Sequence, residues 1–148
     1  MSGHFTIFDI AASGLSAELK RIQVISTNIA NVNSTRTPEG GPYRRKDVIF
    51  EATNIDKDSF ENILNSAVSG EEAVGVEVKE IYNDPSPFIK KYDPQHPDAD
   101  QNGYVSYPNV NVVTEMVNLM NASRSYGANV TVIQSLKNMI SKAFDIGR

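Results

Sequence analysis

The most regular pattern in the chain is an apolar repeat close to its N-terminus. Seven positions recur at alternating intervals of four and three residues, with one polar interruption at Ser26. This spacing is typical of a heptad seam along a helix, and no proline interrupts it. It predicts a helix over residues 5–31, roughly 40 Å long at 1.5 Å per residue. The seam consists of Phe8, Ala12, Leu15, Leu19, Ile22, Ser26 and Ile29.

A second apolar segment predicts a helix over residues 112–144. Asn111 is a suitable N-cap and Glu115 suits the first turn. Lys137 and Lys142 suit the C-terminal end, where the helix dipole favours cations. The apolar residues of this segment point in almost every direction around the axis, so more than one face must be covered.

Gly127 interrupts this second helix. Glycine in a helix interior costs about 1 kcal/mol relative to alanine. We therefore expect a conformational reason or a close packing contact at this position.

The lengths of the two helices limit how they can be covered. A 33-residue helix is about 50 Å long, whereas a compact globule of 148 residues is about 38 Å across. The helices are therefore expected to protrude as an antiparallel coiled-coil pair whose remaining apolar faces need other chains. The alternative is a helical hairpin packed on its own small domain. The charge-poor surface of the two helices exceeds what one hairpin seam can bury, which favours the first interpretation.

The region between the helices has the pattern of loops and short strands. Residues 56–66 are compatible with either strand or helix. Alternating valines predict a half-buried strand from residue 74, with a bulge or an end at Lys79-Glu80. The other expected strands are 47–51, 88–92 and 104–107.

The predicted fold is therefore α+β, with a small, mainly β domain inserted between two long helices. The expected domains are 1–34 and 112–148, which form a helical core, and 35–111, which forms the β-rich insert.

Charge separates the same three segments. The net charge of the chain is -4. Residues 1–34 sum to 0, residues 112–148 to +2 and residues 35–111 to -6, and all seven prolines lie in the central segment. The termini are thus suited to burial and the centre to solvent.

Composition excludes several classes of function. The chain has no cysteine, which excludes disulfides, thiol nucleophiles and cysteine-based metal sites. A net negative charge argues against nucleic-acid binding. No apolar run of about 18 residues is present, and we expect neither a membrane span nor a cleavable secretory signal. No phosphate loop, nucleophile elbow or zinc-protease motif occurs, so we expect neither an enzyme nor a cofactor.

One segment has a metal-like pattern. Asp98, Asp100, Asn102 and Gly103 match four positions of an EF-hand loop, but Asn109 stands where a bidentate glutamate is needed. Acid-Asn-Gly runs are more often plain turns. A calcium- or ligand-binding module around Asp98 and Asp100 is retained as an alternative.

Two other groups of residues have weak functional signals. His4 and His96 are far apart in sequence and are expected to be solvated rather than a catalytic pair. Arg44, Arg45 and Lys46 form a basic cluster, which is expected to be solvated or to face a partner.

The terminal segments carry a family resemblance. Residues 13–31 and 41–46 resemble the N-terminal part of bacterial flagellar axial proteins, the rod, hook and hook-associated proteins. Residues 102–111 and 115–130 extend the likeness, which is to the proximal-rod type; a neighbouring rod protein is the alternative. Gly127 is a departure, because relatives usually carry a larger polar residue there. The motifs are Ser13-Gly14-Leu15-Ser16-Ala17, Ser26-Thr27-Asn28-Ile29-Ala30-Asn31, Tyr107-Pro108-Asn109-Val110-Asn111 and Ala122-Ser123-Arg124-Ser125-Tyr126.

The resemblance implies a structural role in a tube. Axial proteins pair their terminal helices to line a tubular core, and a small β domain faces outward. The subunits are exported unfolded through the type III apparatus without a cleaved signal, so rod proteins, further copies of the chain and the export apparatus are the implied partners. The implied location is the rod of the basal body in the periplasm, with terminal segments that are loose until assembly. A surface-bound amphipathic helix is a weaker alternative, since the first helix has only two bases.

From seam position we expect Leu15, Leu19, Ile22 and Ile29 to pack against Met116, Met120 and Val130. The full set expected in axial-core packing and subunit contacts is Phe8, Leu15, Leu19, Ile22, Asn28, Ile29, Asn31, Met116, Met120, Tyr126, Asn129, Val130, Ile133 and Ile140.

Overall fold

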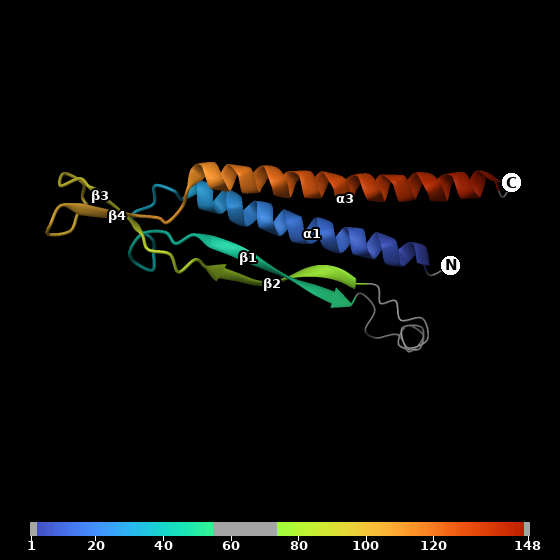
Figure 1. Cartoon of the computed structure of the whole chain (residues 1–148), viewed down its shortest axis with the longest axis horizontal. Helices are drawn as coiled ribbons and strands as arrows, with labels where there is room; N and C mark the ends of the chain where they lie inside the picture. Colours follow the sequence, from blue (N-terminus) through green and yellow to red (C-terminus); the bar gives the residue numbers. More distant parts are fainter. Residues whose placement is uncertain (1–2, 55–73, 147–148) are drawn as a thin grey trace. The chain divides into compact units, whose positions relative to one another are not determined.

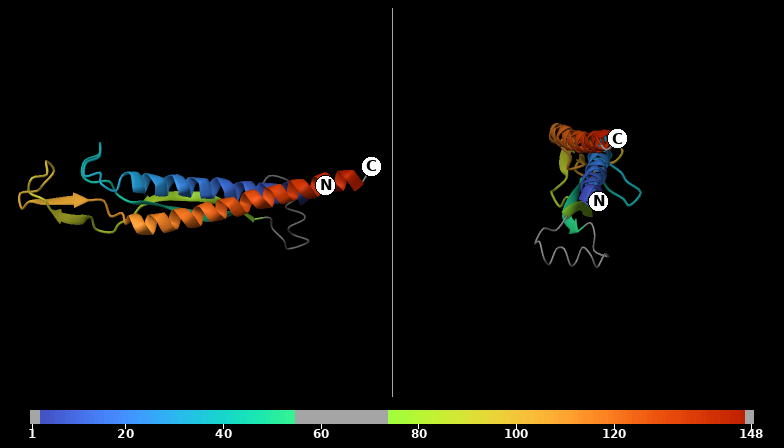
Figure 2. Two further views of the ribbon diagram at one scale, coloured as in Figure 1. Left: turned by 90° about the horizontal axis from the view of Figure 1, so that it is seen from above. Right: turned by 90° about the vertical axis from the view of Figure 1, so that its right-hand side faces the viewer.

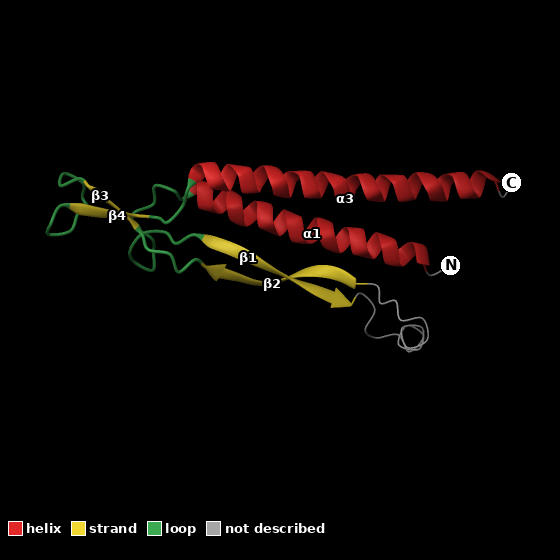
Figure 3. Cartoon of the chain, viewed as in Figure 1, coloured by secondary structure: helices red, strands yellow, loops and turns green. Residues whose placement is uncertain are grey.

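The computed structural model describes residues 3–54 and 74–146 and shows two long helices with strands between them in sequence (Figures 1 and 3). This confirms the predicted α+β class. The elements are α1 (Gly3–Ala30), β1 (Lys46–Asn54), β2 (Val74–Asn83), β3 (Ile89–Tyr92), β4 (Tyr104–Tyr107) and α3 (Val112–Ile146).

The helix boundaries follow local signals. The amides of Val113 and Thr114 donate to Asn111 Oδ1 at 3.0 and 3.2 Å, which confirms Asn111 as the N-cap of α3. At the end of α1 both the main-chain and the side-chain nitrogen of Asn31 donate to Thr27 O. The expected placing of Lys142 at the C-terminal end is wrong, because α3 continues to Ile146 and its last turn holds no basic residue.

The strands form two separate two-stranded sheets, β1 with β2 and β3 with β4. All four predicted strands are confirmed. β2 does not end at Lys79-Glu80 but continues to Asn83, because its pairing with β1 outlasts the alternation of valines. The prediction for residues 56–66 lies outside the described residues.

The β3–β4 hairpin is antiparallel, and Tyr92 faces Tyr104 with ring centroids 5.3 Å apart. Gly103 has φ +79°, and a Cβ there would lie 2.9 Å from a ring carbon of Tyr92. The turn therefore requires glycine on both grounds.

The chain forms two compact units, and both helices contribute to each. Unit 1 comprises Met1–Lys20, Phe50–Lys79 and Ser123–Arg148, and unit 2 comprises Arg21–Ile49 and Glu80–Ala122. Within each unit the segments of α1 and α3 lie side by side and antiparallel (Figures 1 and 2). The division into domains 1–34, 35–111 and 112–148 stays a prediction.

The face that α1 buries differs between the two units and is made of small residues only in unit 1. In unit 1 the buried positions are Ala11, Gly14 and Ala17. A Cβ added at Gly14 would lie 2.8 Å from Asn129 Nδ2, so glycine allows α3 to approach closely. In unit 2 the buried positions of α1 are Val24, Ile25 and Asn28, which lie off the heptad seam.

The described residues include no helix that is long and apolar enough to cross a membrane.

Among residues 3–54 and 74–146 the structure shows neither the conformational reason nor the packing contact that we expected for Gly127. A Cβ there would meet nothing within 4 Å, and the residue has no left-handed backbone conformation. We therefore expect Gly127→Ala to raise the free energy of unfolding by about 0.5–1 kcal/mol, the difference in helix propensity. Urea denaturation followed by far-UV circular dichroism measures this. A lower free energy of unfolding for the variant would show that this turn of α3 does require glycine.

Candidate functional site: the uncovered faces of the terminal helices

The heptad seam of α1 is not the face that the chain itself buries. Ala12, Leu19 and Ser26 are exposed, and Leu19 retains 47% of its surface. The other seam residues, Phe8, Leu15, Ile22 and Ile29, are half-buried. A seam of large apolar side chains thus flanks the small-residue face and remains available for contact.

The first turns of α3, in unit 2, carry a second apolar stripe. Val113, Met116, Val117 and Met120 are spaced i, i+3, i+4 and i+7, so they share one helix face. Their exposed fractions run from 48% for Val117 to 72% for Val113. Glu115 and Ala122, on a different face, are buried. Large exposed apolar patches on a soluble chain typically mark interaction sites.

Further along α3, in unit 1, large apolar side chains are again exposed. Val132, Met139 and Phe144 retain 44%, 56% and 74% of their surface. The expected contact residues of this part are half-buried, namely Tyr126, Asn129, Val130, Ile133 and Ile140. Their role in contacts with other subunits stays a prediction.

A buried polar cluster holds the helices of unit 2 to the chain segment that precedes β1. Asn28 lies at its centre, with no exposed surface, and uses its whole side-chain amide. Its Oδ1 accepts from Tyr43 Oη at 2.9 Å and from the amide of Lys46 at 3.0 Å. Its Nδ2 donates to Lys46 O at 2.8 Å and to Glu115 Oε2 at 3.0 Å. We call Asn28, Tyr43, Arg45 and Glu115 the polar clamp.

The charged half of the polar clamp is an ion pair. Glu115 has no exposed surface, and its Oε1 accepts from Arg45 Nε at 2.8 Å. Arg45 Nη1 also reaches Asp47 at 3.0 Å and Asp84 at 3.3 Å. Burial disfavours the charged form, but hydrogen bonds to Glu115 and Asp47 outweigh it and raise the pKa of Arg45. Burial, with the Glu115 charge, raises the pKa of Tyr43, which stays a neutral donor.

The basic cluster therefore needs a correction. The side chain of Arg45 is 16% exposed and inward-facing, so it is neither solvated nor available to a partner. Arg44 donates to the carbonyls of Asp84 and Ser86, and its guanidinium lies 4.2 Å from the ring centroid of Phe88. Lys46 is exposed, and a partner-facing role for it stays a prediction.

The carboxylates of the EF-hand-like segment stabilise a turn. Asp98 Oδ2 accepts from Thr35 Oγ1 at 2.8 Å. Asp100 Oδ1 accepts from the amides of Tyr104 and Asn102, which lowers the pKa of Asp100. Among the described residues, no three His, Asp or Glu side chains converge on a common point. The hydrogen bonds to Asp100 Oδ1 thus close a turn, as acid-Asn-Gly runs commonly do.

The two histidines are not brought together by any described contact. His96 Nδ1 accepts from the amide of Asp98, and its ring lies 6.4 Å from that of Tyr107. The side chain of His4 lies outside what the structure describes.

Models of known protein families match two segments of the chain, one near each end. Residues 8–36 match the family model described as flagella basal body rod protein. Residues 101–146 match the model described as flagellar basal body rod FlgEFG protein C-terminal. These two segments contain most of the uncovered helix faces and define the class, that of flagellar rod proteins.

Full-length relatives narrow the class. The chain is 46% identical to the flagellar basal-body rod protein FlgC of Borreliella burgdorferi, over 97% of both chains. It is 43% identical to FlgC of Bacillus subtilis, over 97% of this chain and 98% of that one. Identity to FlgC of Salmonella typhimurium is 42%, over 96% of each. The chain belongs to the FlgC family of flagellar basal-body rod proteins.

Proposed function

We propose that the chain is a structural subunit of the proximal flagellar rod and carries torque by packing rather than by chemistry. The observation that carries the proposal is the set of large apolar side chains exposed on both terminal helices. Leu19 on α1 and Met116 and Met120 on α3 are each about half exposed. In a rod built from packed subunits, neighbouring subunits would cover such side chains.

Burial of these faces would supply the energy of assembly. Moving a fully exposed Leu or Met side chain from water into a packed contact contributes about 1.5–3 kcal/mol, and a side chain that is already half covered contributes about half of that. Several such side chains on each subunit are enough to offset the cost of ordering a subunit in the rod. The large seam residues would therefore hold subunits together, and the small-residue face would hold each subunit's own helices together.

The polar clamp would make the subunit stiff. Buried polar groups whose hydrogen bonds are all satisfied fix a single arrangement, because a shift of one element would leave several groups unpaired. Asn28 and Glu115 thus fix the axial register of α1 against α3 within unit 2. A shaft that transmits torque requires subunits that do not slip in this way.

The remaining parts of the proposal follow from the resemblance to axial proteins. The partners are other rod proteins and further copies of the chain, with the type III export apparatus in transit. The location is the periplasmic part of the basal body, reached without a cleaved signal. No catalysis, cofactor or nucleic-acid partner is proposed. An alternative assignment is a neighbouring position in the rod.

Deletion and localisation test the proposed function. In a strain that lacks this gene, we expect no rods and no swimming, and both should return with an epitope-tagged copy. Basal bodies purified from the complemented strain should contain the tagged chain, and a density map of them should place it in the proximal rod. Intact basal bodies that lack the chain would overturn the proposal, and a position elsewhere in the rod would favour the alternative.

A further inference from the structure

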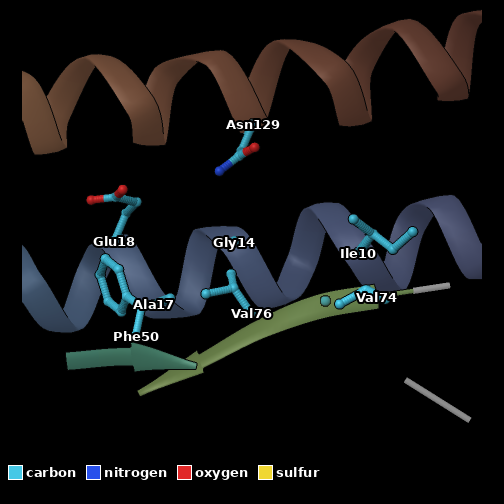
Figure 4. Close-up of a pocket in the computed structure, with 9 residues that line it drawn as sticks. Ile10, Gly14, Ala17, Glu18, Phe50, Val74, Val76 and Asn129 are labelled. Atoms are coloured by element: carbon cyan, nitrogen blue, oxygen red, sulfur yellow. The ribbon is translucent and has the colours of Figure 1, made fainter. Parts of the chain in front are cut away.

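A cavity of about 290 Å³ lies within unit 1, between α1, α3 and the strands β1 and β2 (Figure 4). Its walls combine apolar and polar surface, and the large apolar side chains include Ile10, Phe50 and Val76. Two polar side chains point into the space between the helices, the carboxylate of Glu18 and the amide of Asn129 (Figure 4). The volume is at the lower end of the range of ligand pockets and fits one long side chain.

The carboxylate of Glu18 is incompletely satisfied. Its Oε2 is fully covered, yet it has no hydrogen-bond partner among the described residues. A buried charged oxygen without a partner is costly, and such groups in native proteins usually serve a contact or a ligand. A complementary ligand would have a cationic head for Glu18 and an apolar stem for the walls. Lysine and arginine side chains have this chemistry.

An arginine fits the pocket better than a lysine. The planar guanidinium presents several N–H donors in a fixed fork, whereas the ammonium is a compact, strongly hydrated charge. The fork can donate to the carboxylate of Glu18 and to the side-chain carbonyl of Asn129 together, because both point into one cavity.

Arg124 is an exposed arginine in the same unit, and it forms no salt bridge within the described residues. Arg124 precedes Asn129 by five residues, so the two side chains leave α3 about 140° apart around the helix axis. Because Asn129 faces the cavity, Arg124 points away from the cavity of its own chain. Its height along the helix nevertheless matches that of the cavity. Gly14 lies opposite Asn129, and four residues further along α1 the antiparallel pairing brings Glu18 level with residue 125.

We propose that the cavity receives the Arg124 side chain of a second copy of this chain. The inference rests on the proposed function, because it needs copies packed side by side. Arg124 and the cavity lie on different faces of unit 1 at the same level along the helices. Each copy can therefore insert its arginine into one neighbour and accept the arginine of another. Such a head-to-tail contact does not close on a pair but continues into a ring or an open helix, the symmetry that a tube requires.

Cysteine cross-linking in assembled basal bodies tests the proposal, and the chain has no native cysteine to interfere. Val74 lines the cavity and is 42% exposed, and Ala128 is exposed one turn from Arg124 on the same face. The double variant Val74→Cys, Ala128→Cys keeps Glu18 and Arg124 intact. A short bismaleimide should cross-link it into dimers and higher multiples of the chain.

The matched control is Val74→Cys, Ser135→Cys. Ser135 is exposed on the same face of α3 as Arg124 but about 16 Å further along, so it should give no multimers. Adding Glu18→Gln to the first pair should lower the cross-linked fraction at least about tenfold, because it removes one partner of a buried ion pair. A charge exchange, Glu18→Arg with Arg124→Glu, should restore swimming that either single change reduces.

The outcomes separate this inference from the proposed function. If the chain is present in basal bodies but the first pair gives no multimers, the inference is wrong and the rod assignment stands. Cross-links to a protein of a different mass would show that the neighbour at the cavity is another rod protein rather than a second copy of this chain, and would overturn the proposal. Multimers that persist unchanged with Glu18→Gln would show that Glu18 does not receive the arginine and would overturn the proposal. Absence of the chain from basal bodies would overturn the proposed function itself.

Discussion

The variant Arg45→Met is expected to lower the free energy of unfolding by about 3–5 kcal/mol, the largest stability effect in the chain. Methionine fills a similar volume but removes the charge that faces Glu115. Glu115 has no exposed surface, so its carboxylate would remain buried with only the Asn28 amide as a partner. Removing one member of a buried pair is costly because the other member stays desolvated and uncompensated.

Urea denaturation of the purified monomer at neutral pH measures this effect. Lys46→Met is the matched control, because Lys46 neighbours Arg45 in sequence but is exposed and forms no salt bridge within the described residues. The control should change the free energy of unfolding by less than about 0.5 kcal/mol. A loss below 1 kcal/mol for Arg45→Met would mean that the polar clamp is not a stabilising unit.

The double variant Arg45→Met, Glu115→Leu should recover part of the loss. Replacing both members of a buried ion pair by apolar residues is often neutral, whereas replacing one is not. The comparison therefore separates the energy of the pair from the penalty of an orphaned charge.

Local patterns predict the secondary structure of this chain well. The heptad seam and Asn111 set the extent of α1 and the start of α3, and alternation around Val76 places β2. These signals act within a few residues, where backbone sterics and capping decide the outcome. The slip in alternation at Lys79-Glu80 does not mark the end of β2, because strand pairing with β1, which is not local, extends the strand to Asn83.

The polar clamp could not be predicted in the same way. Asn28 and Glu115 are 87 residues apart in sequence, and Arg45 is 70 residues from Glu115. Each residue alone has an adequate local explanation, as a helix-end asparagine, a first-turn acid or a member of a basic cluster. Only the three-dimensional contacts show that these residues satisfy one another.

The heptad seam shows a second limit on what the sequence can predict. A seam shows that a helix face is to be buried, but not whether the same molecule or another one buries it. In this chain the small residues Ala11, Gly14 and Ala17 take the intrachain contact, since they let the helix backbones approach closely. The larger residues of the seam are thereby left half-buried or, for Leu19, exposed, so that a neighbouring subunit can cover the rest of their surface.

The variant Leu19→Asp should separate the two kinds of contact. Leu19 is 47% exposed in the monomer, so the change should alter its free energy of unfolding by no more than about 1 kcal/mol, mainly through helix propensity. In the rod the same side chain would be buried against another subunit, where an unpaired carboxylate carries a large desolvation penalty. We therefore expect swimming in soft agar and the number of rods to fall by at least about tenfold.

Gln23→Asp provides the control for this change. Gln23 is exposed one turn further along α1 but lies off the seam, so the substitution adds the same charge and a similar loss of helix propensity without entering the contact. It should leave swimming near normal, and immunoblots of exported protein must show equal secretion of both variants, since an export defect would mimic an assembly defect. Normal swimming of Leu19→Asp would remove the seam from the subunit interface. The exposed stripe of Met116 and Met120 on α3 would then be the face that neighbouring subunits cover.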